Sequence, residues 1–74
     1  MEHVLQNIKT LRILRNLTQA TLAAELNIGT RQYNNLENGK SDFKLTQLSI
    51  IAQMLKVRLA VLFSDDLTGF LDRA

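Results

Sequence analysis

One stretch constrains the fold of this chain more than any other: the run LTQATLAAELNIGTRQYNNL, which ends at Leu36. Thr18 lies near its start, where a side-chain oxygen can accept hydrogen bonds from backbone N–H groups that lack helical partners. Apolar residues then recur at offsets of three and four, which gives a helix one apolar face: Leu22, Ala23 and Leu26. The pattern predicts a helix of about two turns that ends near Glu25.

The next residues, Leu26–Gly29, interrupt this period. They include Asn and Gly, two residue types that accept turn geometry readily. A second helix is then expected from Thr30 to Leu36 or Glu37. Two short helices joined by a turn of about four residues match the helix-turn-helix unit, in which the helices cross at a steep angle.

The outward face of this second helix carries the chemistry. At about 100° per residue, Tyr33 and Leu36 point toward the core. An Arg can donate two hydrogen bonds to guanine, an Asn or Gln can pair with adenine, and a Thr can contact base edges or a thymine methyl group. We therefore predict base contacts from the residues that are polar on this helix: Thr30, Arg31, Gln32, Asn34 and Asn35. The alternative is an ordinary polar face of a small helical protein.

Residues Leu17–Lys40, LTQATLAAELNIGTRQYNNLENGK, resemble the Cro and phage-repressor (XRE) type of bacterial regulators. The resemblance rests on LTQ, on LA shortly after it and on LENGK, and it extends more weakly from about Ile8 to Phe63. It implies an all-α protein: a compact bundle of about five short helices that contains a helix-turn-helix. The tail beyond the resemblance has room for a short C-terminal helix. The implied partner is double-stranded DNA.

The resemblance also implies specific contacts. In that family an Arg in the first helix pairs with the Glu after the recognition helix, and these positions are Arg12 and Glu37 here. The alternative is two exposed charges. The implied phosphate contacts come from residues at the start of the first motif helix and in the loop after the second: Thr18, Gln19, Asn38 and Lys40. The alternative for Gln19 is a solvent-exposed side chain, and the alternative for Asn38 and Lys40 is a loop without a binding role.

Tyr33 is expected in the core with its hydroxyl group hydrogen-bonded. The alternative is that Tyr33 contacts DNA.

Composition and charge fit a DNA-binding domain. The chain has 74 residues, which suggests one domain, with its core at about residues 5–63. Residues 1–58 carry eight Lys and Arg against four acids, whereas residues 59–74 carry one Arg against three Asp. We expect the basic body to face phosphate and the acidic tail to point away. There is no Cys, no apolar run long enough to span a membrane and no signal-peptide pattern, so we expect a cytoplasmic protein.

Other helices are expected on both sides of the motif. A first helix over Glu2–Asn16 has its apolar side at Val4, Ile8, Leu11 and either Leu14 or Arg15. A core helix over Leu45–Lys56 is expected to be capped by Asp42 or Ser41. It buries one face and leaves Ile50 and Met54 as candidate subunit contacts; the buried residues are Leu45, Leu48, Ile51, Ala52 and Leu55.

The C-terminal part is harder to assign from its pattern. Val57–Phe63 suits a short helix that closes the core with Leu59, Leu62 and Phe63, and a strand that pairs across a dimer is the alternative. The tail over residues 64–74 starts with Ser64 as an expected helix cap. It contains an apolar patch that could fold back onto the core, although a contact with a second subunit fits the function better: Leu67, Phe70 and Leu71.

These features predict a sequence-specific DNA-binding transcriptional regulator that places the helix at residues 30–37 in the major groove. One helix reads too few base pairs to select a genomic site, so we expect a homodimer on a palindromic operator. The alternative is an antitoxin-type module that binds a toxin protein and regulates its own operon. With one His, no Cys and no glycine-rich phosphate loop, we expect no enzymatic activity, no cofactor and no bound metal.

Overall fold

The computed structural model describes the backbone of residues 1–73 and the side chains of residues 1–71. Its secondary structure there consists of helices without strands, which confirms the all-α prediction. The helices are α1 (Glu2–Leu14), α2 (Gln19–Glu25), α3 (Thr30–Glu37), α4 (Leu45–Met54), α5 (Leu59–Leu62) and α6 (Thr68–Arg73). The strand alternative for residues 57–63 is wrong, because this segment forms α5.

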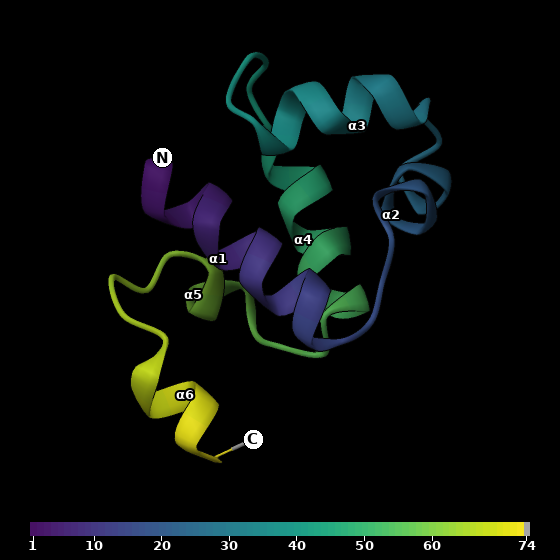
Figure 1. Ribbon diagram of the computed structural model, residues 1–74. Coiled ribbons are helices and arrows are strands. Elements are labelled where there is room, and N and C mark those ends of the chain that lie inside the picture. Colours follow the sequence, from purple (N-terminus) through teal and green to yellow (C-terminus); the bar gives the residue numbers. More distant parts are fainter. Residues whose placement is uncertain (74) are drawn as a thin grey trace.

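The helices enclose one core. Helix α1 lies against α3 and α5, while α4 lies against α2 and α5. Helix α3 crosses one end of the molecule, and α6 lies at the opposite end (Figure 1). The fully buried side chains come from α1 to α5 and their ends: Val4, Ile8, Leu11, Leu22, Tyr33, Ile51, Leu55 and Leu62. Burial of this apolar surface is the main term that stabilises the fold.

Four helices end in the same way. Each is followed by a residue with positive φ: Asn16 at 58°, Asn27 at 62°, Gly39 at 82° and Lys56 at 59°. The next N–H then donates back to a carbonyl five residues earlier, as Leu17 does to Arg12 at 3.0 Å. This is the Schellman geometry, which satisfies carbonyls at the helix end and turns the chain sharply.

The helix-turn-helix forms as the sequence predicts. The Thr18 hydroxyl accepts the N–H of Thr21 at 3.1 Å and so caps α2. The turn between the two helices contains Asn27 in the left-handed conformation, and Ile28 after it packs against the core. Helices α2 and α3 contact one another extensively, so the angle of α3 is set by α2 and by the core below it.

Three residues that we expected in the core are exposed: Leu14 (48%), Leu45 (63%) and Phe63 (45%). Each lies at a helix end, where the apolar stripe of the helix extends beyond the core that it covers. Leu14 is the last residue of α1, Leu45 is the first of α4, and Phe63 directly follows α5. Arg15, which was the alternative to Leu14, lies partly buried and donates to the Leu55 carbonyl at 3.0 Å.

Two expected caps are also wrong. Helix α4 begins after Lys44, whose N–H donates to the Gln47 side chain at 2.9 Å, so neither Ser41 nor Asp42 caps it. In the tail, Ser64 forms a local turn with Asp66. The Asp66 carboxylate accepts the N–H of Thr68 at 2.9 Å, and α6 therefore begins at Thr68 and not directly after Ser64.

The tail folds back onto the body. Leu67 is only 8% exposed and belongs to the core, and Phe70 packs partly against it. The core therefore covers Leu67, which corrects our preference for a second subunit as its cover, whereas Phe70 stays half-buried. Leu71, at 38% exposed, is the member of the predicted patch that a partner could still reach.

Candidate nucleic-acid interface

Helix α3 exposes one face and buries the other. Tyr33 and Leu36 are buried in the core, as the helical period predicts. Thr30, Arg31 and Gln32 in the first turn are exposed. In the described part of the chain the side chains of these three residues have no hydrogen-bond partner within the protein. Their donors and acceptors are therefore available for base edges.

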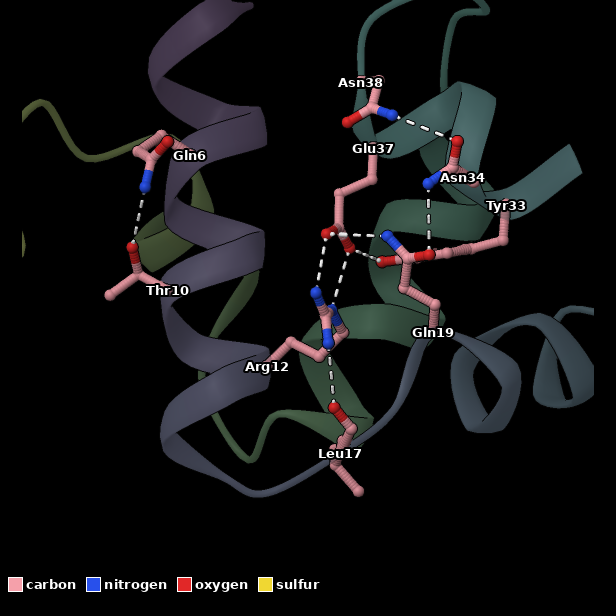
Figure 2. Close-up of polar contacts among 9 residues, drawn as sticks. All are labelled: Gln6, Thr10, Arg12, Leu17, Gln19, Tyr33, Asn34, Glu37 and Asn38. Carbon is pink, nitrogen blue, oxygen red and sulfur yellow. Dashed lines mark hydrogen bonds and ion pairs between the residues drawn. The ribbon is translucent and has the colours of Figure 1, made fainter. Parts of the chain in front are cut away.

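The two asparagines of α3 are half-buried and differ from one another. The Asn34 amide donates to the Gln19 side chain at 3.2 Å and accepts from the Asn38 side chain at 3.1 Å. Among the described residues the Asn35 side chain has no such partner. Of the five predicted base-contact residues, Asn34 is thus the one that other side chains hold (Figure 2).

Arg12 and Glu37 are brought together by α1 and the end of α3. Two guanidinium nitrogens of Arg12 donate to the two carboxylate oxygens of Glu37, Nε to Oε2 at 3.0 Å and Nη2 to Oε1 at 2.9 Å. The Arg12 side chain is 12% exposed and that of Glu37 is 1% exposed, so this is a buried ion pair and not two exposed charges. Arg12 also donates to the Leu17 carbonyl at 3.0 Å, next to the entry of α2.

Tyr33 joins Arg12 and Glu37 in one buried cluster of polar groups. It is fully buried, lies edge-on to the Phe43 ring and donates its hydroxyl to Glu37 Oε2 at 2.7 Å. Burial, together with this hydrogen bond to a carboxylate, raises the pKa of Tyr33, so the phenol stays protonated at neutral pH. Because its ring and hydroxyl are both occupied inside the protein, Tyr33 is a core residue of α3.

Glu37 carries a negative charge at neutral pH in spite of its position. Burial acts to raise the pKa of its carboxyl group, but hydrogen bonds from Arg12, Tyr33 and Gln19 outweigh burial, and the pKa is lowered overall. The three donors come from α1, α3 and α2 respectively. One buried carboxylate therefore joins the two motif helices to α1 (Figure 2).

The predicted phosphate-contact residues lie at the start of α2 and in the loop after α3. Gln19 lies in the first turn of α2, and its amide nitrogen donates to Glu37 at 3.3 Å. Asn38 and Lys40 lie in the loop after α3 and are exposed. Between them Gly39 has a φ of +82°, and a Cβ there would lie 3.3 Å from Leu5, so a larger residue would disturb this loop. Thr18 is exposed, but its hydroxyl already serves the α2 cap.

The side-chain network around Asn34 was not predicted, although one sequence signal could have indicated part of it. Asn34 and Asn38 are four residues apart, which is the helical spacing at which amide side chains meet. The link from Asn34 across to Gln19 could not be inferred in this way, because it depends on the crossing of two helices.

Two features are absent from the residues that the structure describes. They contain no group of three or more His, Cys, Asp or Glu residues arranged to hold a metal ion. They also include no helix that is long and apolar enough to cross a membrane.

An exposed polar helix, fixed on a shorter helix across a tight turn and followed by an exposed polar loop, is typical of one class: helix-turn-helix proteins that bind DNA. The chain belongs to this class by sequence as well, because the family model described as Helix-turn-helix matches residues 8–62. This confirms the resemblance to the Cro and phage-repressor type. The protein is thus a DNA-binding transcription regulator.

A curated relative supports the same family. The chain is 36% identical over 50 residues to Control protein C.MunI of Mycoplasma sp, and the match covers 68% of each chain. No solved structure matches the chain significantly.

Proposed function

We propose that the protein is a sequence-specific regulator that inserts α3 into the major groove of DNA and acts by occupying an operator. The observation that carries this proposal is the exposed first turn of α3, where Thr30, Arg31 and Gln32 have no partner within the described part of the chain. Asn35 extends the same face by one turn. The mechanism consists of recognition and occupancy and involves no chemical step.

Phosphate contacts would fix the register of α3. Gln19 at the start of α2 contacts Asn34 of the reading helix, and the loop of Asn38 and Lys40 follows the end of that helix. Such contacts position a protein on DNA without reading its sequence. The rigid Arg12–Glu37 pair supports this arrangement, because it connects α1 to the end of α3 next to that loop.

We further propose that the protein acts as a homodimer on a palindromic operator. A two-fold dimer would place two copies of α3 in successive major grooves about 34 Å apart and so double the sequence that is read. The name of the relative, a control protein, fits a regulatory role. The antitoxin alternative drew on the apolar tail, and with Leu67 covered by the core no specific observation favours it.

Two single variants test the proposal after the preferred site has been selected from a pool of random duplexes. Arg31→Ala should cost about 1–3 kcal/mol on that site and relax the preference at one base pair. Lys40→Ala should weaken binding to all duplexes alike and reduce the slope of the salt dependence by about one. Affinities are measured on the selected site and on random DNA at several salt concentrations. If the two variants lose the same affinity on both kinds of DNA, the assigned roles are wrong.

A further inference from the structure

A chain of side-chain amides leads from the buried carboxylate to the surface of the candidate DNA interface. Gln19 Nε2 donates to Glu37 Oε1 at 3.3 Å, Asn34 Nδ2 donates to Gln19 Oε1 at 3.2 Å, and Asn38 Nδ2 donates to Asn34 Oδ1 at 3.1 Å. Figure 2 shows that the four side chains follow one another from Glu37 to Asn38. Asn34 is the middle of this chain.

Glu37 sets the direction of the hydrogen bonds in this series of amides. An ionised carboxylate can only accept hydrogen bonds, and Arg12 and Tyr33 already donate to it. Gln19 must therefore turn its NH₂ group to Glu37 and its carbonyl oxygen to Asn34. It follows that Asn34 turns its NH₂ group to Gln19 and its oxygen to Asn38. Each amide has one orientation that satisfies both neighbours.

An asparagine that reads adenine needs both ends of its amide, one to donate and one to accept. In Asn34 each end of the amide already makes one hydrogen bond, to Gln19 on α2 and to Asn38 at the end of α3. Gln19 and Asn38 are the residues that we place against phosphate, and each keeps the second hydrogen of its NH₂ group for that contact. Asn34 keeps one further N–H and one further lone pair, but its bonds to Gln19 and Asn38 fix the directions in which these point, so the amide could not turn toward a base without releasing them.

We propose that Asn34 is a positioning residue that ties Gln19 to Asn38 and thereby fixes the spacing of two phosphate contacts beside α3, without reading a base itself. Base recognition is then left to Thr30, Arg31, Gln32 and Asn35. This inference rests on the proposed insertion of α3 into the major groove.

The test compares Asn34→Ala with Asn35→Ala, which is the same change one residue further along α3. Asn34→Ala should weaken binding about 5–20-fold on the selected site and on random duplexes alike, since it loosens phosphate contacts and leaves the base preference unchanged. Asn35→Ala should instead relax the preference at one base pair. Base preference is measured by competition with duplexes that differ at single positions.

A mutant cycle separates positioning from a direct contact. In the Gln19→Ala/Asn38→Ala background, Asn34→Ala should cause no further loss of affinity, because the residues through which it acts are gone. Asn34→Ser, which keeps a polar group but cannot span both partners, should behave like Asn34→Ala. It replaces Asn34→Ala in the cycle if thermal denaturation shows that the alanine variant does not fold.

The outcomes distinguish this inference from the function on which it rests. If Asn34→Ala relaxes a base preference, or if its loss persists in the double-variant background, Asn34 reads DNA directly and the inference is overturned. The proposed function can still stand in that case. If Arg31→Ala leaves both the affinity and the base preference unchanged, the proposed insertion of α3 into the major groove is wrong, whatever Asn34→Ala does.

Discussion

Glu37 shows how a single residue can hold a small domain in register. Its two oxygens accept four hydrogen bonds, from Arg12 twice, from Tyr33 and from Gln19. Removing a carboxylate from water is costly, and a buried ion pair often adds little net stability compared with apolar residues of the same shape. The contribution of the buried Glu37 here is to the orientation of the helices, since its donors fix the relative positions of α1, α2 and α3.

We expect stability to fall as the protein is acidified through the folded-state pKa of Glu37. Burial raises that pKa, but hydrogen bonds from Arg12, Tyr33 and Gln19 lower it more. The unfolded chain therefore takes up this proton at a higher pH than the folded protein does. The contribution is complete above the ordinary pKa of a glutamate, about 4.3, and is lost as the pH falls through the lower folded-state value.

The matched variant is Glu37→Gln, which keeps the shape and removes the titrating group. At neutral pH it should cost about 3 kcal/mol, because Arg12 is left buried beside a neutral partner. The difference from the unaltered protein should shrink on acidification. Urea denaturation between about pH 7 and about pH 3 measures both effects. An undiminished difference at the acidic end would exclude Glu37 as the source, and Asp65→Asn on the exposed His3 pair should change nothing.

At the scale of helices, four helix ends share one backbone conformation. Three of the four residues with positive φ are Asn or Gly, the types that accept this conformation, and Lys56 is the exception. A residue with a Cβ pays about 1–2 kcal/mol in the left-handed helical region, and Gly does not. Lys56 is exposed, so its side chain contributes little packing in return.

Lys56→Gly should therefore stabilise the protein by about 0.5–1 kcal/mol, after allowing for the greater freedom of Gly in the unfolded chain. The melting temperature should rise by about 2–8 °C for a domain of this size. The control is Lys9→Gly, the same change at an exposed position inside α1, which should destabilise by about 1 kcal/mol. A fall in melting temperature for both variants would show that the strain at Lys56 is compensated by contacts of its side chain.

Helix positions could be predicted from the sequence because apolar spacing and turn residues both mark them. Asn16 and Asn27 end their helices as expected. The start of α4 could not be predicted in this way, since it is marked by Gln47 reaching back to the Lys44 backbone and not by a residue of the usual capping types. The exposure of Leu45 could not be predicted either, because the spacing of apolar residues shows which face of a helix is apolar but not how far along that face the core extends.

The same limit applies to the candidate site. Helical geometry correctly separated the buried Tyr33 and Leu36 from the exposed Arg31. It could not separate Asn34 from Asn35, which both lie at the border of the exposed face. What distinguishes them is a hydrogen bond to Gln19 on another helix, and this depends on the angle at which α2 and α3 cross.

On the scale of the whole molecule, the tail belongs to the body. Asn7 on α1 is buried and donates to the carbonyls of Leu62 at 3.1 Å and Ser64 at 2.7 Å, which holds the chain where it leaves α5. Leu67 then fills a place in the core. With Leu67 buried, the tail offers a second subunit a smaller apolar surface, and the half-buried Ile50 and Met54 on α4 offer another.

If the proposed dimer forms on this face of α4, Ile50→Glu should break it without unfolding the protein, because a half-buried position on a helix accepts Glu more readily than a subunit core does. Sedimentation equilibrium should then show a monomer where the unaltered protein is dimeric. Affinity for a palindrome should fall at least about tenfold, while affinity for one half-site stays the same, since only the linkage of two half-sites is lost. Ile13→Glu, the same change at an exposed residue of α1, is the control and should leave both unchanged. A dimer that survives Ile50→Glu but not Ile13→Glu would place the interface on α1 instead.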